Sequence, residues 1–122
     1  MALEKELQTT IFKKYGALPW LKIWRCNTGS AIGVSFIMKA KRLGYFPDNM
    51  PITRYGVIGM PDIMGIIAPA GRLVGIEVKS PTGRQTPEQK LWQKVITDLG
   101  GLYILAKHID DITEALQHDQ QA

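Results

Sequence analysis

Two short apolar segments, at residues 62–68 and 73–79, are separated by a Pro-Ala-Gly turn, a pattern that predicts an antiparallel β-hairpin. The second segment ends in Ile-Glu-Val-Lys, so Glu77 and Lys79 stand among apolar residues, and Asp62 begins the first segment. Placing charges in such a setting costs on the order of several kcal/mol unless they pair or bind a metal. The hairpin is therefore expected to form the centre of the fold and to carry a charged site.

The segments around the hairpin alternate between helical and strand patterns. Apolar spacing predicts helices over residues 2–15, 86–99 and 109–117, and alternation predicts strands over residues 20–26 and 102–106. Periodicity is weak over residues 31–56, where a loop or hairpin insertion is expected, and residues 118–122 are expected to form a frayed tail. The predicted order is helix-strand-strand-strand-helix-strand-helix, an α/β fold with a mixed central sheet flanked by helices.

Length and composition narrow the class of protein. A chain of 122 residues is expected to form one domain, and 45% hydrophobic with 21% charged residues is typical of an ordinary globular protein. The net charge of +4 mildly favours a polyanionic partner. A single cysteine, Cys26, excludes an internal disulfide or a cysteine zinc cluster and favours a reducing compartment. The sequence has no membrane-spanning segment, signal peptide or phosphate-binding glycine loop, so we expect a cytoplasmic protein without membrane association or a nucleotide cofactor.

The predicted hairpin brings three charged side chains toward one end. Side chains alternate across a strand, so Glu77 and Lys79 share one face, and Asp62 on the antiparallel strand falls opposite them. Carboxylate oxygens suit Mg²⁺, so Asp62, Glu77 and the carbonyl of Val78 are candidate metal ligands. Lys79 could orient a water or favour hydroxide beside such an ion. This arrangement predicts hydrolysis of a phosphodiester.

A plainer interpretation of the same residues stays open. Glu77 and Lys79 would then form the polar face of a half-exposed strand, with Asp62 as a turn residue after Pro61. A lone Glu-x-Lys favours this interpretation, but here the tripeptide follows a Gly-x-Pro-Asp turn and a short strand, and it precedes a capped helix. That ordered set favours the metal site.

The motifs resemble those of a known nuclease family. The resemblance lies in Gly-Met-Pro-Asp ending at Asp62, Ile-Glu-Val-Lys ending at Lys79, Gln89, Gly-Gly-Leu-Tyr ending at Tyr103, and Arg-Cys-Asn-Thr-Gly starting at Arg25. These look like the PD-(D/E)xK nucleases, and most closely the small stand-alone virus-type replication-repair nuclease (VRR-NUC) domain. The resemblance implies a restriction-endonuclease-like core, cleavage of DNA with Mg²⁺ or Mn²⁺, and action on branched DNA as a homodimer. It also implies that Asp62, Glu77 and Lys79 are catalytic.

Two further site residues follow from the resemblance. The family usually places on its first helix a glutamate that reaches the metal, and Glu4 is preferred over Glu6 because of its spacing to the following Leu-Gln pair. A first-turn acid favoured by the helix dipole is the alternative role of Glu4. Gln89 is expected to contact a metal-bound water or a phosphate, and its alternative role, closing a capping box with Thr86, is compatible with the first.

Residues expected to contact the DNA backbone are Asn27, Ser30, Arg54, Arg84 and Lys90. The two polar residues also suit a turn without further function, and each of the three basic residues could be a solvated charge. The three tryptophans are expected to fill the core rather than to stack on bases; they are Trp20, Trp24 and Trp92.

Three functions fit these residues. The first is a metal-dependent endonuclease for structured DNA, such as a four-way junction or a flap. The second is a catalytically silent DNA-binding module with the same fold, and the third is an assembly protein whose carboxylates pair with Lys79. The presence of Asp62, Glu77 and Lys79 together favours the enzyme.

Overall fold

The structure, a computed structural model, describes residues 2–26, 34–45, 47 and 58–121. The chain divides into two compact units, of which the first comprises Met1–Cys26 with Gly59–Ala122 and the second comprises Asn27–Ile58. The single domain expected over residues 1–122 remains a prediction.

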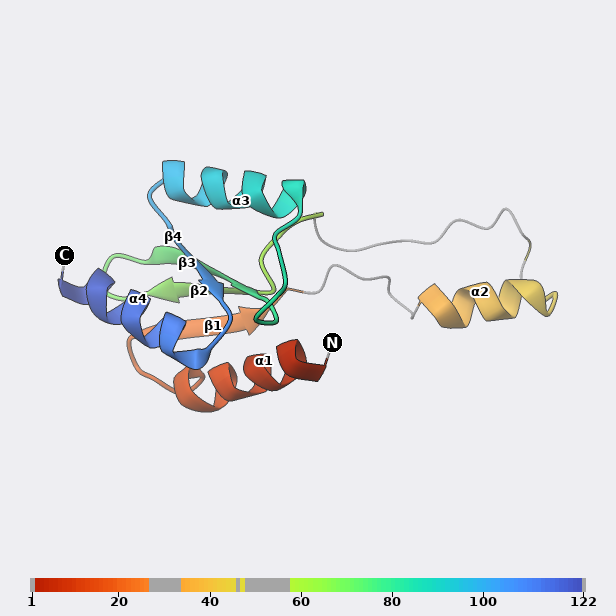
Figure 1. Ribbon diagram of the computed structural model, residues 1–122, viewed down its shortest axis with the longest axis horizontal. Coiled ribbons are helices and arrows are strands. Elements are labelled where there is room, and N and C mark those ends of the chain that lie inside the picture. Colours follow the sequence, from red (N-terminus) through yellow and green to blue (C-terminus); the bar gives the residue numbers. More distant parts are fainter. Residues whose placement is uncertain (1, 27–33, 46, 48–57, 122) are drawn as a thin grey trace. The chain divides into compact units, whose positions relative to one another are not determined.

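The first unit is built on a four-stranded mixed sheet (Figure 1). Its strands are β1 (Leu21–Arg25), β2 (Ile63–Ile67), β3 (Arg72–Val78) and β4 (Leu102–Ala106), and they lie in the order β1-β2-β3-β4. The first three strands are antiparallel neighbours, and β4 runs parallel to β3. The predicted hairpin, now β2 and β3, is confirmed at the centre of the sheet.

Three helices cover the two faces of this sheet (Figure 1). They are α1 (Ala2–Tyr15), α3 (Pro87–Asp98) and α4 (Ile109–Gln121). Helices α1 and α4 lie on one face, where the main core forms, and α3 lies on the other. The main core consists of Ile11, Tyr15, Leu21, Ile23, Ile63, Ile67, Val74, Ile76, Val78, Ile104, Ala106, Ile112 and Leu116. The predicted α/β fold with a mixed sheet flanked by helices is therefore confirmed.

The face that carries α3 requires a glycine at its centre. A Cβ atom added to Gly75 on β3 would lie 2.9 Å from Cγ of Pro61 and 3.0 Å from Cδ1 of Ile96. These separations are too short for ordinary van der Waals contact, so the glycine lets both residues pack directly on the strand. Pro61, which precedes the site residue Asp62, is fully buried there.

Helix α4 is longer than predicted. It continues to Gln121, whereas the sequence pattern predicted an end at Gln117 and a frayed tail after it. Asp119 forms an ion pair with Arg72 on β3, and Arg72 Nε also donates a hydrogen bond to the Gly100 carbonyl at 3.0 Å. This long-range pair joins the last turns of the helix to the sheet, which local periodicity could not reveal.

The second unit contains a helix where a loop or hairpin was predicted. Helix α2 spans Val34–Arg42, and Gly44, two residues beyond its end, has a φ of 83° in the left-handed region. The Gly44 N–H donates to the Lys41 carbonyl and the Tyr45 N–H donates to the Ala40 carbonyl, each at 3.0 Å. This pair of bonds is the Schellman C-cap, which satisfies carbonyls at a helix end. At nine residues the helix is shorter than the window of about 11–18 residues over which helical periodicity is judged.

None of the described helices is long and apolar enough to cross a membrane.

Candidate active site

The candidate site lies where β2 begins and β3 ends. Ile63 pairs with Ile76, so Asp62, one residue earlier, falls opposite Glu77. The Oδ2 atom of Asp62 accepts a hydrogen bond from the Val78 N–H at 2.9 Å, and its carbonyl accepts one from the Cys26 N–H at 2.8 Å. Asp62 is thus held between its two neighbouring strands. Burial and the charge of Asp62 both raise the pKa of the Cys26 thiol.

Glu77 projects from β3 toward α3 and is almost completely buried. Only 2% of its surface is exposed. Its Oε1 atom accepts a hydrogen bond from Gln89 Nε2 at 2.9 Å and lies 3.8 Å from Lys79 Nζ. The plainer interpretation of Glu77, the polar face of a half-exposed strand, is therefore wrong.

The second oxygen of Glu77 has no partner among the described residues. Oε2 is buried and accepts no hydrogen bond. Burial first, and then the neighbouring charge of Asp62, raises the pKa of Glu77 to about 8, although the charge of Lys79 lowers it. Two ionised carboxylates cannot hydrogen-bond to each other, because both are acceptors. Either a shared proton or a cation is needed to stabilise Asp62 and Glu77 side by side.

Gln89 joins the site to the start of α3. Its Oε1 atom accepts a hydrogen bond from the Thr86 N–H at 2.8 Å, and Thr86 Oγ1 accepts one from the Gln89 N–H at 3.2 Å. These two bonds form the predicted capping box, which is confirmed. The amide Nε2 of the same side chain donates to Glu77, so Gln89 caps the helix and contacts the site at once. Its contact with a water or a phosphate remains a prediction.

Gly59 sets the position of the turn that leads to Asp62. Its φ is 85°, and a Cβ atom added there would lie 2.5 Å from the backbone carbon of Glu88. Only glycine adopts this φ readily and also leaves room for the helix backbone. The Gly-x-Pro-Asp turn therefore packs against the first turn of α3, which places Asp62 near Gln89.

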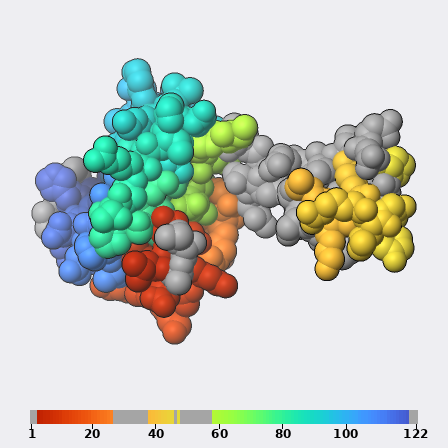
Figure 2. Space-filling view, turned by 45° about the vertical axis from the view of Figure 1, so that its right-hand side comes forward, coloured from red at the N-terminus to blue at the C-terminus, as the bar shows by residue number. Residues whose placement is uncertain are grey.

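Glu4 forms a hydrogen bond beside the site from α1, and Glu6 lines a groove together with Lys79 and Ser80. The Oε1 atom of Glu4 accepts a hydrogen bond from the Ser80 N–H at 3.2 Å, directly after the strand that carries Glu77. The charge of Glu4 contributes to the raised pKa of Glu77. In the space-filling view the first turns of α1, drawn in red, lie beside the residues that follow β3 (Figure 2). Metal binding by Glu4 remains a prediction.

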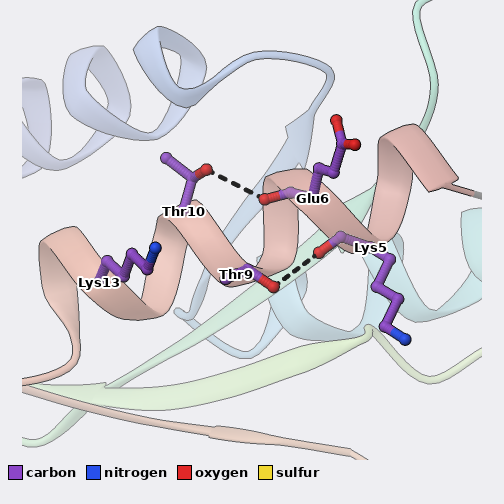
Figure 3. Close-up of a pocket in the computed structure, with 5 residues that line it drawn as sticks. All are labelled: Lys5, Glu6, Thr9, Thr10 and Lys13. Atoms are coloured by element: carbon purple, nitrogen blue, oxygen red, sulfur yellow. Dashed lines mark hydrogen bonds between the residues drawn. The ribbon is translucent and has the colours of Figure 1, made fainter.

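Glu6 also lines a second hollow, of about 550 Å³, along the exposed side of α1 (Figure 3). The described residues that line this hollow are Lys5, Glu6, Thr9, Thr10 and Lys13. Both threonine hydroxyls donate to carbonyls one turn earlier in the same helix, at 3.1 Å for Thr9 and 3.0 Å for Thr10. The two threonine hydroxyls of this hollow are thus bonded to the helix itself.

Sequence reasoning missed a polar chain beside the carboxylates. Gln85 Nε2 donates to the Tyr103 hydroxyl at 3.0 Å and to Gln93 Oε1 at 3.1 Å. Burial raises the pKa of Tyr103 to about 12; the bond from Gln85 lowers it, and the charges of Glu77 and Asp62 raise it. The Tyr103 phenol thus remains protonated at neutral pH. Its only sequence signal was its place at the end of the Gly-Gly-Leu-Tyr motif.

The predicted DNA contacts are only partly described by the structure. Arg84 and Lys90 are exposed on the β3–α3 loop and on α3, and both are accessible to a ligand. Asn27, Ser30 and Arg54 lie outside the described residues.

The tryptophan prediction is wrong for Trp24. Its side chain is 40% exposed, because α3 covers β3 and β4 but leaves the corresponding face of β1 open. Trp20 and Trp92 are partly buried.

The donor set is compatible with a hard divalent cation. The described residues contain no group of three or more His, Cys, Asp or Glu side chains at metal-binding spacing. Mg²⁺, however, commonly uses only one or two protein carboxylates and completes its shell with water and substrate. Asp62 and Glu77 supply two, and the buried, unpartnered Oε2 of Glu77 is the kind of atom that such an ion satisfies. Asp62 and Glu77 therefore fit Mg²⁺. Metal binding by the Val78 carbonyl remains a prediction.

Comparisons with known proteins agree with the motifs. Residues 51–108 match the family model of the VRR-NUC domain, which is a nuclease-type domain. A solved structure named "VRR_NUC domain protein" has a TM-score of 0.56 and 21% sequence identity, covering 95% of this chain and 86% of its own. At this identity the likeness shows the fold alone. The curated proteins contain no match. The resemblance to the VRR-NUC domain predicted from the motifs is confirmed.

Proposed function

We propose that this chain, whose residues 51–108 match a nuclease-type domain, is a metal-dependent endonuclease that hydrolyses phosphodiester bonds in structured DNA. A four-way junction or a flap is the proposed substrate, and Mg²⁺ is the proposed ion, with Mn²⁺ able to replace it. The observation that carries the proposal is the buried Oε2 of Glu77, which has no partner among the described residues and lies beside the carboxylate of Asp62. A divalent cation would stabilise this pair of carboxylates, which otherwise needs a shared proton.

The proposed roles of the side chains are metal binding and orientation of the attacking water. Asp62 and Glu77 would hold the ion, with Glu4 and the Val78 carbonyl as further oxygen donors. A bound divalent ion supplies a Lewis acid for the phosphate and lowers the pKa of water. Lys79, whose Nζ lies 3.8 Å from Glu77, would orient the attacking water. As the water oxygen bonds to phosphorus and releases a proton to solvent, the opposite P–O bond breaks and the leaving oxygen takes up a proton from solvent.

The remaining residues would position these groups and the substrate. Gln89 holds the Oε1 atom of Glu77 through its hydrogen bond of 2.9 Å, so the unpartnered Oε2 keeps its direction. Backbone phosphates of the DNA would be bound without base specificity, as is usual for basic and polar side chains. The proposed contacts are Asn27, Ser30, Arg54, Arg84 and Lys90.

The direct test is cleavage of a labelled four-way junction and a labelled flap with Mg²⁺ or Mn²⁺. We expect cleavage with either ion, no cleavage in EDTA, and none with Asp62→Ala. Asp98→Ala is a matched control, because it removes an exposed aspartate whose ion pair, within the described part of the chain, is with Lys94 on α3. This control should cut normally. Intact DNA under every metal condition would overturn the proposal, and salt-sensitive binding without cleavage would support the silent DNA-binding module instead.

The proposed assembly is a homodimer. One chain carries one such site, so paired incisions across a junction require two copies related by symmetry. Light scattering at the working concentration of the cleavage assay should give twice the mass of the chain. A monomeric mass under these conditions would count against the dimer and would leave the single-site chemistry unaffected.

A further inference from the structure

Arg25 ends β1 at the same edge of the sheet as the carboxylates. It pairs with Ile63, the residue after Asp62, and the following residue, Cys26, donates its N–H to the Asp62 carbonyl at 2.8 Å. Adjacent strands lie about 4.8 Å apart, so the backbone of Arg25 is one strand removed from that of Asp62. Alternation along β1 directs Arg25 to the face that α1 covers, together with the buried Ile23.

Two neutral residues of α1 hold the Arg25 side chain in place. Its NH1 atom donates a hydrogen bond to Gln8 Oε1 at 2.7 Å, and its guanidinium carbon lies 4.7 Å from the centre of the Phe12 ring. These contacts fix the guanidinium plane, and neither neutralises its charge. Arg25 is exposed and forms no ion pair with any residue that the structure describes.

Among the residues that the structure describes, only Gln8 accepts a hydrogen bond from this fixed guanidinium, which leaves most of its donors for a ligand. A guanidinium has five N–H donors in a planar fork that matches phosphate, and Gln8 takes one of them. A DNA strand that brings a phosphate to Asp62 and Glu77 also brings neighbouring phosphates past the strand next to β2. Acidic residues at the site would repel these phosphates, whereas a fixed cation one strand away would attract them.

We propose that Arg25 binds the DNA backbone at a phosphate next to the scissile one, with Gln8 and Phe12 as its positioning residues. This inference rests on the proposed function, because it names a contact between the same site and its substrate. A purely structural Arg25, which only ties β1 to α1, would leave DNA affinity and its salt dependence unchanged.

The test compares Arg25→Gln with Lys22→Gln. Lys22 lies on the same strand, is exposed and has the same charge, but it pairs with Ile66 and so stands three residues farther along the sheet from Asp62 than Arg25 does. Arg25→Gln removes the charge while keeping a stem against Phe12 and an amide that can bond to Gln8. Arg25→Lys keeps the charge and loses the fork. Binding of a labelled junction is followed by fluorescence anisotropy in EDTA over a range of salt concentrations, and thermal unfolding verifies that each variant is folded.

Arg25→Gln is expected to weaken binding roughly 5- to 10-fold and to reduce the slope of log K against log salt by about 1, as for the loss of one phosphate contact. Lys22→Gln should change neither value, and Arg25→Lys should keep the slope with intermediate affinity. Equal effects of the two glutamine variants would overturn the inference, as would a native protein that binds no DNA. Arg25-dependent binding without cleavage under any metal would uphold the inference while rejecting the proposed endonuclease. Cleavage by the native protein, together with equal DNA binding by the two glutamine variants, would uphold the proposed endonuclease and reject the role of Arg25.

Discussion

The carboxylate of Asp62 is hydrogen-bonded across the central hairpin to the main chain of Val78, with 2.9 Å between Oδ2 and N. The bond spans two strands at the point where β3 leaves the sheet, one residue beyond Glu77. Asp62 therefore serves the fold as well as the site. A substitution there will change stability and activity for different reasons, and a pair of variants can separate the two.

Asp62→Ala leaves the Val78 N–H without its acceptor, whereas Asp62→Asn retains a carbonyl oxygen of similar reach. Both variants remove the repulsion of Glu77, so the difference between them reports the hydrogen bond. We expect Asp62→Ala to be less stable than Asp62→Asn by about 1–3 kcal/mol. Urea unfolding without metal measures this difference, and both variants should lack cleavage. Equal stability of the two would show that the bond contributes nothing.

The raised pKa of Glu77 should make the stability of the folded protein depend on pH. Its pKa is raised from 4.5 to about 8 in the folded, metal-free protein, so the folded state keeps a proton that the unfolded state releases. The free energy of unfolding from this group therefore falls as pH rises from about 4.5 to 8, by at most about 1.4 kcal/mol per pH unit. Urea unfolding in EDTA across this range measures the slope.

Glu77→Gln is the matched control for that slope. The glutamine does not titrate, its oxygen can still accept from Gln89, and its amide can donate to Asp62. The variant should therefore lose the contribution of Glu77 to the slope and should be more stable than the native protein at pH 8. An identical slope in both proteins would show that Glu77 does not cause the pH dependence of stability.

Divalent cations should stabilise the folded protein above pH 8 through Asp62 and Glu77. A ligand that binds only the folded state raises stability by about 2.7 kcal/mol at 100 times its Kd. Thermal unfolding with increasing Mn²⁺ should show a rising Tm for the native protein and a constant Tm for Glu77→Gln. Because this measurement needs no DNA, it tests the ion site independently of cleavage. An equal rise for both proteins would place the ion elsewhere.

The two roles of Gln89 can be separated with Thr86. Gln89→Ala and Thr86→Ala each remove half of the capping box, so each should cost about 1 kcal/mol of stability. Only Gln89→Ala also removes the hydrogen bond to Glu77. Single-turnover cleavage should therefore fall about 10-fold or more with Gln89→Ala, equivalent to about 1.4 kcal/mol, and change little with Thr86→Ala. Similar cleavage by both variants would reduce Gln89 to a helix cap.

Gly59→Ala should destabilise the protein more than Gly100→Ala. Both glycines have φ near 90°, but a Cβ at Gly100 meets nothing within 4 Å, whereas one at Gly59 meets the Glu88 backbone. The shared φ cost is on the order of 1–3 kcal/mol, and the contact at Gly59 adds to it. Urea unfolding of the two variants measures the difference. Equal losses would mean that the turn can move away from α3 freely.

Much of the candidate site could be predicted from the sequence, because the patterns that indicate it involve residues close together in the chain. A hairpin depends on two neighbouring strands and their turn, and a capping box depends on residues three apart, so Asp62, Glu77 and Thr86 could be interpreted locally. From the sequence, the two roles of Gln89, closing the capping box and contacting the site, were compatible but neither implied the other. Its bond to Glu77 required knowledge of how α3 lies on the sheet.

Sequence alone determined the order of the strands and helices of the first unit, the central hairpin and the charged residues at its end, since alternation and capping act between near neighbours. Tertiary structure decided that Glu4 forms a hydrogen bond beside the site, because its partner Ser80 lies 76 residues away. It also decided that Trp24 is exposed and Glu77 buried, since burial depends on which part of a sheet face a distant helix covers. The unpartnered oxygen of Glu77 arises from that burial, and only the folded chain could show it.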